Sequence, residues 1–79
     1  MFYVYILKSS KDGNLYIGKT NDLGRRLKEH NSGQVSLTKF RRPFTIIKTT
    51  PCETEPEARK LELEYKKGYK REELKKELL

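Results

Sequence analysis

Hydrophobic residues recur at every second position near the start of the chain. Residues 2–8 are strong β-formers with apolar side chains at alternate positions, which predicts a strand. Turn-forming residues follow at 9–13, and a second short strand is predicted at 14–18. Two strands joined by a loop of this kind predict an antiparallel hairpin.

A helical pattern replaces the alternation after the hairpin. The segment Thr-Asn-Asp at 20–22 supplies N-cap candidates, and Leu23 and Leu27 lie four residues apart. A helix is therefore predicted from this segment to about Asn31, where Ser-Gly follows and ends it.

The second half of the chain contains one more strand and two more helices. A basic loop is predicted at 34–42, and the β-branched run at 44–50 predicts a third strand. The residues at 54–57 (Thr-Glu-Pro-Glu) fit a capping box with Pro in the first turn, so a helix should run to about Lys67. A last, highly charged helix is predicted at 71–79.

The predicted order of elements is β-β-α-β-α-α. A chain of 79 residues is short enough for one domain. We therefore expect a single α+β domain over residues 1–79, with a small three-stranded antiparallel sheet flanked by helices.

The two faces of the predicted hairpin differ in chemistry. Register is fixed by burying the purely apolar positions together. This places five residues in one layer: Phe2, Val4, Ile6, Leu15 and Ile17. Tyr5 and Tyr16 then share the opposite face, either as amphipathic cover for a half-exposed sheet or as part of a site.

The first helix places two polar residues where they can join the tyrosines. Arg26 and His30 are four residues apart and lie on one helix face, beside the leucine stripe. Each also has an ordinary interpretation, as a surface cation and as a structural histidine. Arg25 and Glu29 have the same spacing and are expected to form a surface ion pair.

Glu62 stands out on the second helix. Ala58, Leu61 and Tyr65 mark the inner face of this helix, and Glu62 falls inside that stripe. A carboxylate on a buried face is costly unless it is paired or bound to a metal. The spacing equally allows a plain ion pair between Glu62 and Lys66 on a wet edge.

Composition favours a nucleic-acid partner. Lys and Arg number 18 against 11 acidic residues, for a net charge of +7 and a pI near 9.6, which fits nucleic acid better than an anionic membrane. There is no long apolar run, so no membrane-spanning helix is expected. The single cysteine excludes an internal disulfide and fits a reducing cytoplasm. One cysteine and one histidine also exclude a Cys/His zinc site.

Together these residues resemble the GIY-YIG nuclease family, and within it the small stand-alone bacterial members. The resemblance covers nearly the whole chain. It rests on four segments: Tyr3-Val4-Tyr5 at the first motif, Tyr16-Ile17-Gly18 at the second, the run 19–33 (KTNDLGRRLKEHNSG) and the segment 57–62 (EARKLE). Two departures are the Tyr3-Val4 pair in place of Gly-Ile, and the lack of a counterpart to the asparagine that larger members carry after the glutamate.

The resemblance implies a Mg²⁺-dependent (or Mn²⁺-dependent) DNA endonuclease with a role in DNA repair or processing. Carried over position by position, it implies five catalytic residues: Tyr5, Tyr16, Arg26, His30 and Glu62, with Glu62 as the metal ligand. It also matches Lys19 to a lysine that some members place beside the second triplet.

Four cations are expected to bind DNA, and they are Lys19, Lys39, Arg41 and Arg42. The last three lie in the basic loop, where we expect contacts to the phosphate backbone and low sequence specificity. No obligate protein partner is evident. The alternatives are a non-catalytic nucleic-acid-binding module with the same fold, or a protein-interaction domain whose tyrosine face docks a partner.

The sequence leaves open which tyrosine is the general base. A tyrosine has a reference pKa of about 10, and nearby cations are expected to lower it. Lys19 and the start of the first helix lie close to Tyr16 in the chain, which favours Tyr16 over Tyr5. His30 would orient the tyrosine or the water, or carry the proton.

Overall fold

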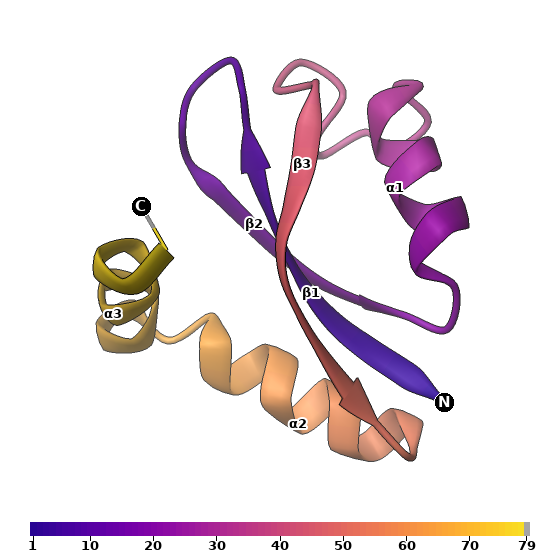
Figure 1. Cartoon of the computed structure of the whole chain (residues 1–79), viewed down its shortest axis with the longest axis vertical. Coiled ribbons are helices and arrows are strands. Elements are labelled where there is room, and N and C mark those ends of the chain that lie inside the picture. Colours follow the sequence, from indigo (N-terminus) through magenta and orange to yellow (C-terminus); the bar gives the residue numbers. More distant parts are fainter. Residues whose placement is uncertain (79) are drawn as a thin grey trace.

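The computed structural model describes residues 1–78, and its order of elements confirms the predicted β-β-α-β-α-α arrangement (Figure 1). The strands and helices have the following bounds: β1 Phe2–Ser9, β2 Leu15–Thr20, α1 Leu23–Asn31, β3 Phe44–Cys52, α2 Glu55–Tyr65 and α3 Gly68–Leu78.

The three strands form one antiparallel sheet in the order β2-β1-β3, so the first strand lies in the centre. In the hairpin, Ile6 lies opposite Ile17, and Tyr5 lies opposite Gly18. Residues that lie opposite each other share a face. The register therefore confirms that the apolar positions of both strands face one side and that Tyr5 and Tyr16 face the other.

Each face of the sheet is covered by different helices. Figure 1 shows the sheet between α1 on one side and the α2–α3 pair on the other. The α2–α3 side holds the larger apolar core, which contains Val4, Ile6, Leu15, Ile17, Cys52, Ala58, Tyr65 and Leu74. Beneath α1, a smaller cluster of Tyr5, Leu7 and Phe44 contacts Leu23 and Leu27.

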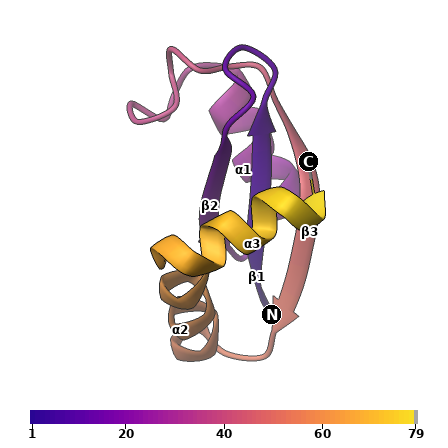
Figure 2. The same cartoon turned by 90° about the vertical axis from the view of Figure 1, so that its left-hand side faces the viewer.

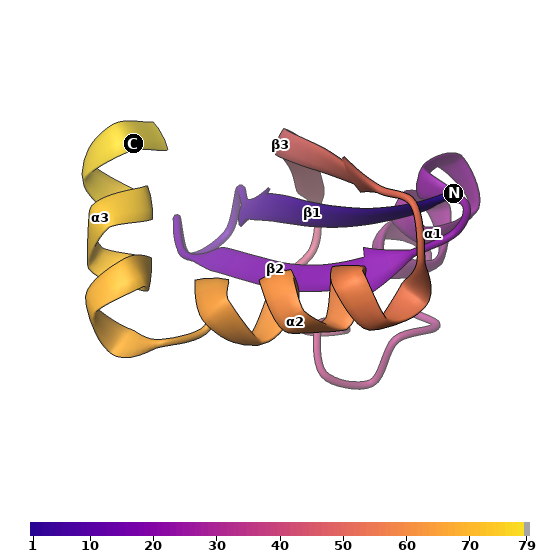
Figure 3. The same cartoon turned by 90° about the horizontal axis from the view of Figure 1, so that it is seen from below.

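One edge of the sheet is flanked by two protruding elements. Figure 2 shows the loop between α1 and β3 and the helix α2 extending past β2 at opposite ends of the strand. Figure 3 shows α2 running alongside β2, in agreement with the contacts between these two elements. The β2 edge is thus a surface to which both sides of the sheet contribute.

The strands extend further than the pattern predicted. β2 continues to Thr20 because Lys19 and Thr20 pair with Val4 and Tyr3. β3 includes Pro51, which an edge strand tolerates because one side of it has no ladder partner.

The helix ends also differ by a few residues. α2 ends at Tyr65 rather than near residue 67, and α3 begins at Gly68 rather than 71. Thr54 caps α2 as predicted, but the Glu57 carboxylate accepts from the N–H of Glu53 rather than of Thr54. Within residues 1–78, no helix combines the length and the apolarity that crossing a membrane requires.

Candidate active site

The Tyr5 ring crosses the backbone of β2 at Gly18. A Cβ atom at position 18 would overlap the Tyr5 hydroxyl, so only glycine lets the ring reach this edge of the sheet. The Tyr5 side chain is 2% exposed. The glycine of the second triplet therefore has a steric role: it allows a buried tyrosine of the first triplet to direct its hydroxyl towards the β2 edge.

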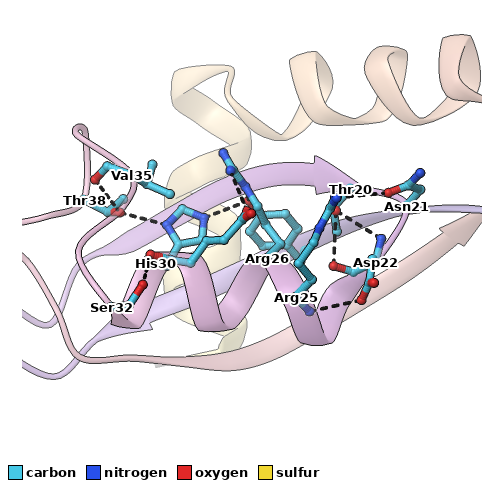
Figure 4. Close-up of polar contacts among 11 residues, drawn as sticks. Thr20, Asn21, Asp22, Arg25, Arg26, His30, Ser32, Val35 and Thr38 are labelled. Atoms are coloured by element: carbon cyan, nitrogen blue, oxygen red, sulfur yellow. Dashed lines mark hydrogen bonds and ion pairs between the residues drawn. The ribbon is translucent and has the colours of Figure 1, made fainter.

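The Tyr5 hydroxyl belongs to a network of hydrogen bonds that ends inside the protein. Figure 4 shows the part of this network at Arg26, His30 and Thr38. The Tyr5 hydroxyl lies 2.9 Å from His30 Nε2 and accepts from Arg26 Nε at 3.4 Å. On the far side of the imidazole, His30 Nδ1 lies 2.8 Å from Thr38 Oγ1. The Thr38 hydroxyl donates to the backbone carbonyl of Val35 at 3.4 Å.

We assign the protons in this hydrogen-bond network from the bond between Thr38 and Val35. The Thr38 hydroxyl uses its one proton on the Val35 carbonyl, so it accepts from the N–H at Nδ1 of His30. A neutral imidazole has only one N–H, and Nε2 is then a lone-pair acceptor. Tyr5 therefore donates its phenol proton to His30, and each donor in the chain has an acceptor.

Burial keeps both members of the Tyr5–His30 pair neutral. His30 is fully buried, and desolvation, followed by the positive charge of Arg26, lowers its pKa to about 4. Burial raises the pKa of Tyr5 above 10, against the opposing hydrogen bond from Arg26. Desolvation thus exceeds the effect of Arg26, although the hydrogen bond and charge of this guanidinium lower the Tyr5 pKa in the direction that the sequence predicted.

Arg26 is held in place by an acidic residue that the sequence assigned elsewhere. Arg26 Nη1 lies 3.1 Å from Glu29 Oε1, and Arg25 instead donates to Asn21 Oδ1 at 3.3 Å. The predicted Arg25–Glu29 pair is thus wrong. Arg26 faces Tyr5, and the Glu29 carboxylate one turn later pairs with it. The hydrogen bond to Tyr5, and after it the hydrogen bond to Glu29, raises the pKa of Arg26.

Tyr16 lies beside this chain without joining it. Its ring packs edge-on against His30 with centroids 5.0 Å apart, and its centroid is 6.5 Å from that of Tyr5. Among residues 1–78, the Tyr16 hydroxyl has no hydrogen-bond partner, whereas the Tyr5 hydroxyl has two.

Lys19 faces the other side of the sheet from Tyr16. It lies opposite Val4, and its Nζ is 3.5 Å from Glu55 Oε1 on α2. It reaches the site only around the β2 edge, where Lys19 and Arg26 both line a hollow of about 250 Å³. Proximity to Tyr16 in the chain therefore does not place Lys19 on the face of the sheet that carries the tyrosines.

Glu62 lies on α2, the helix that contacts β2. Its side chain is 16% exposed, and Lys66 Nζ lies 3.6 Å from its carboxylate, so the ion pair that the spacing allowed is present. The Glu62 charge also contributes, behind burial and Tyr16, to the raised pKa of Tyr5. Glu62 thus lies on a helix that covers the face of the sheet opposite to Tyr5.

A single carboxylate suits one class of metal site. Within residues 1–78, no three His, Cys, Asp or Glu side chains cluster closely enough to hold an ion by themselves. A closed zinc site is incompatible with this donor set. Mg²⁺ and Mn²⁺ fit it, because Mg²⁺ is bound through one or two carboxylates together with waters and substrate phosphate oxygens.

The three cations of the basic loop have different surroundings. Arg41 is held by Asp12 at 2.7 Å and by the Leu15 carbonyl at 3.4 Å, so it fastens the loop to the hairpin. Lys39 and Arg42 remain exposed. The Arg42 guanidinium lies against Gly33, whose φ of +83° is the left-handed conformation that favours glycine after a helix.

Sequence reasoning missed Thr38 and the role of Glu29. The polar pattern marked the loop around Thr38 only as basic, and nothing in its spacing singled out one buried hydroxyl. A signal was nevertheless available: a histidine on a buried helix face needs partners for both ring nitrogens, and the loop following its helix is the nearest source.

Known proteins resemble this chain over nearly its whole length. A family model described as the GIY-YIG catalytic domain matches residues 1–77. A UPF0213 protein of Staphylococcus saprophyticus is 40% identical over 74 residues, which cover 92% of this chain and 89% of that protein. A UPF0213 protein of Staphylococcus aureus strain Mu3 is 45% identical over 65 residues, or 81% of this chain and 78% of that protein.

A solved structure shares the fold. The solution NMR structure of a UPF0213 protein from Bacillus halodurans superimposes with a TM-score of 0.57 at 40% identity. The match covers 94% of this chain and 82% of that chain.

Proposed function

Because the chain belongs to the GIY-YIG catalytic domain family, we propose that it is a metal-dependent endonuclease that hydrolyses phosphodiester bonds in DNA, in repair or another processing step. One observation carries the proposal: the Tyr5 hydroxyl bonds to a buried neutral histidine and to an arginine at the same point of the sheet edge. A proton acceptor and a phosphate-binding cation thus lie side by side.

In the proposed reaction, Tyr5 is the general base and His30 receives the proton through it. As the water oxygen attacks phosphorus, its proton moves to the Tyr5 oxygen, and the Tyr5 proton moves to His30 Nε2. The phosphorus–oxygen bond to the leaving group breaks, and that oxygen takes a proton from solvent. His30 later returns its proton through Tyr5, because the fully buried imidazole has no direct exposure to water.

The raised pKa of Tyr5 explains why the histidine is needed. A phenol with a pKa above 10 is not ionised at neutral pH, so a preformed tyrosinate would be scarce. Tyr5 avoids the tyrosinate form if it passes its own proton to His30 while it accepts a proton from water. The Thr38 hydroxyl holds the N–H at Nδ1, which keeps Nε2 free to accept.

Arg26 is positioned to bind the phosphate. Its Nε donates to Tyr5 and its Nη1 to Glu29, while its Nη2 has no partner among residues 1–78. The remaining N–H groups would donate to the non-bridging phosphate oxygens and stabilise the charge of the transition state. A lysine would supply the charge without this fork geometry.

Glu62 would hold the divalent metal beside the phosphate. A bound Mg²⁺ or Mn²⁺ would supply charge neutralisation to the phosphate oxygens. Lys66, the present partner of Glu62, is exposed and can move to solvent when the carboxylate takes a cation.

The cations around the edge would bind the DNA backbone. Lys39 and Arg42 are exposed on the loop, and Lys19 shares a hollow with Arg26. Contacts of this kind position the backbone and carry little sequence information. We therefore propose low sequence specificity, with Arg41 acting mainly to hold the loop.

Nicking of a supercoiled plasmid with Mg²⁺ tests the metal assignment. Glu62→Gln should reduce the rate by about 10²–10³, as expected when a group that stabilises transition-state charge is lost. Glu64→Gln is the matched control, because Glu64 lies on the same helix and also pairs with a lysine. If Glu62→Gln nicks DNA as fast as the parent, Glu62 does not hold the metal.

The same assay separates the two tyrosines. Tyr5→Phe should lose more activity than Tyr16→Phe, because only the Tyr5 hydroxyl is bonded to His30 and Arg26. The reverse order would assign the base to Tyr16.

The Glu62–Lys66 pair favours a second candidate, a non-catalytic nucleic-acid-binding module, because it satisfies the carboxylate without a metal. DNA binding that is unaffected by EDTA, with no nicking of any DNA form, would support this second function.

A further inference from the structure

Two large apolar side chains protrude from the loop between α1 and β3. Leu37 is 78% exposed and Phe40 is 75% exposed. They lie three residues apart in a segment that also carries exposed Lys39 and Arg42. Their exposure has a free-energy cost in water and needs an explanation, because apolar side chains grouped on a surface usually mark a contact.

The loop is fastened at its base, so the exposure is part of a defined conformation. The Asn31 side chain bonds to both the N–H and the C=O of Phe44, at 2.7 and 3.1 Å. The Ser9 hydroxyl donates to the Arg41 carbonyl, and Arg41 is held by Asp12. These contacts tie both ends of the loop to the sheet and to α1.

Inside this loop, Thr38 points inwards between exposed neighbours. Thr38 is fully buried and bonds to His30, whereas its neighbours Leu37 and Lys39 are exposed. Figure 4 shows Thr38 and Val35 next to the His30 ring. The same short segment therefore supports the proposed proton acceptor on one side and displays Leu37 and Phe40 to solvent on the other.

The charges around Phe40 indicate the chemistry of its partner. Lys39 Nζ lies 5.5 Å from the centre of the Phe40 ring, a cation–π arrangement. An aromatic ring among cations is the combination that binds single nucleic-acid strands, with the cations on the phosphates and the ring stacked on a base. Bases inside a duplex are stacked on each other and present no free face to such a ring.

We propose that Phe40, assisted by Leu37, stacks on an unpaired nucleobase of the bound DNA strand, so that the protein prefers DNA with unpaired bases beside the cleaved bond over intact duplex. This inference rests on the proposed function and adds the substrate class to it. Stacking is tolerant of base identity, so it agrees with low sequence specificity.

The chain contains no tryptophan, so Phe40→Trp introduces a single fluorescent reporter. In EDTA, where cleavage does not proceed, titration with an unstructured single-stranded oligonucleotide should reduce its emission through stacking. A blunt, fully paired duplex of equal charge, without a loop, should not. Leu63→Trp is the matched control, because Leu63 is 54% exposed on α2, away from the loop.

Affinity gives a second readout. Phe40→Ala should weaken binding of the single strand by about 5- to 100-fold, the usual range for loss of one stacked base. Its affinity for the duplex should change less than twofold, and Leu63→Ala should change neither. Equal responses to both DNA forms, no response of the Phe40→Trp emission, or equal quenching of Leu63→Trp would overturn the proposal. Because neither readout requires cleavage, failure of the nuclease function would leave this result interpretable.

Discussion

The two faces of the central strand β1 are built on different principles. On the α2–α3 side, Ile6 is buried among apolar side chains that stabilise the fold. On the α1 side, its neighbour Tyr5 is almost equally buried but lies in a chain of polar groups with His30 and Thr38. Two consecutive residues of β1 therefore have different surroundings: Ile6 belongs to the larger apolar core, and Tyr5 belongs to a buried polar network.

Buried polar side chains are tolerated on the α1 side because all of their polar atoms are hydrogen-bonded. Within residues 1–78, every buried side-chain nitrogen and oxygen has a hydrogen-bond partner, so no buried polar group bears an uncompensated desolvation cost. Truncating one member of this hydrogen-bond network should leave a buried polar group unpaired and interrupt the proposed proton relay. Truncating an apolar residue on the other face opens a cavity.

Loss of the Tyr5 hydroxyl should give the largest effect on function. Tyr5→Phe should reduce the single-turnover cleavage rate by about 10²–10⁴, the usual contribution of a general base. Unfolding in urea should show a loss of only about 1–3 kcal/mol, from the unpaired Nε2 of His30. Tyr3→Phe, on the same strand face, is the control and should change the rate less than twofold. A fully active Tyr5→Phe variant would show that the Tyr5 hydroxyl is not the general base.

Substitution of Ile6, the next residue of β1, should have the opposite result: a large loss of stability and a small change in cleavage rate. Ile6 is fully buried, and Ile6→Ala should lower the free energy of unfolding by about 2–5 kcal/mol. Its cleavage rate, measured at low temperature and corrected for the folded fraction, should stay within about threefold of the parent. A large loss of rate in the folded fraction would mean that the two faces are coupled, and the comparison would fail.

The separation of the two faces was predictable because alternation is a local rule. Burying the apolar set of the hairpin was sufficient to place Tyr5 and Tyr16 together, and the register confirms this. The N-caps were predictable for the same reason, since Asp22 and Thr54 act on residues three positions away.

The sequence did not predict contacts for which several partners are equally spaced along the chain and only the folded structure selects one. Glu29 is as well spaced for Arg25 as for Arg26, and only the direction of Arg26 towards Tyr5 decides the pairing. Thr38 binds His30 through the fold of an irregular loop that has no period. The pKa of Tyr5 also depends on the balance between its burial and its hydrogen bond from Arg26, and spacing does not give that balance.

The buried histidine should make stability depend on pH. The unfolded chain protonates His30 near pH 6.5, whereas the folded chain resists until about pH 4. Between these values only the unfolded state gains the proton, so the free energy of unfolding falls as the pH falls. The loss should total about 3 kcal/mol.

Urea unfolding of the parent and of His30→Gln between pH 7.5 and 4 measures this difference. The parent should lose about 3 kcal/mol more than the variant across the window. Asp12, whose pKa is lowered to about 2 mainly by its hydrogen bond to Arg41, begins to reduce stability near pH 4, where the unfolded chain takes up its proton. Both proteins contain Asp12, so its contribution cancels in the difference. Parallel pH curves for the two proteins would show that the folded protein protonates His30 over the same pH range as the unfolded chain.

The smallest predicted effect tests how the relay is oriented. Thr38→Val keeps the shape of the side chain but removes the acceptor for His30 Nδ1–H, so the imidazole loses its preference for the tautomer with Nε2 free. The cleavage rate should fall by about tenfold, the size of a bias of roughly 1.4 kcal/mol between tautomers. Thr38→Ser, which retains the hydroxyl, should restore most of the rate. The ¹⁵N chemical shifts of the His30 ring separate positioning from general destabilisation: they should report an Nδ1–H tautomer in the parent and in Thr38→Ser, and a mixture in Thr38→Val. An unchanged tautomer in a slower Thr38→Val protein would place the role of Thr38 in loop packing rather than in proton transfer.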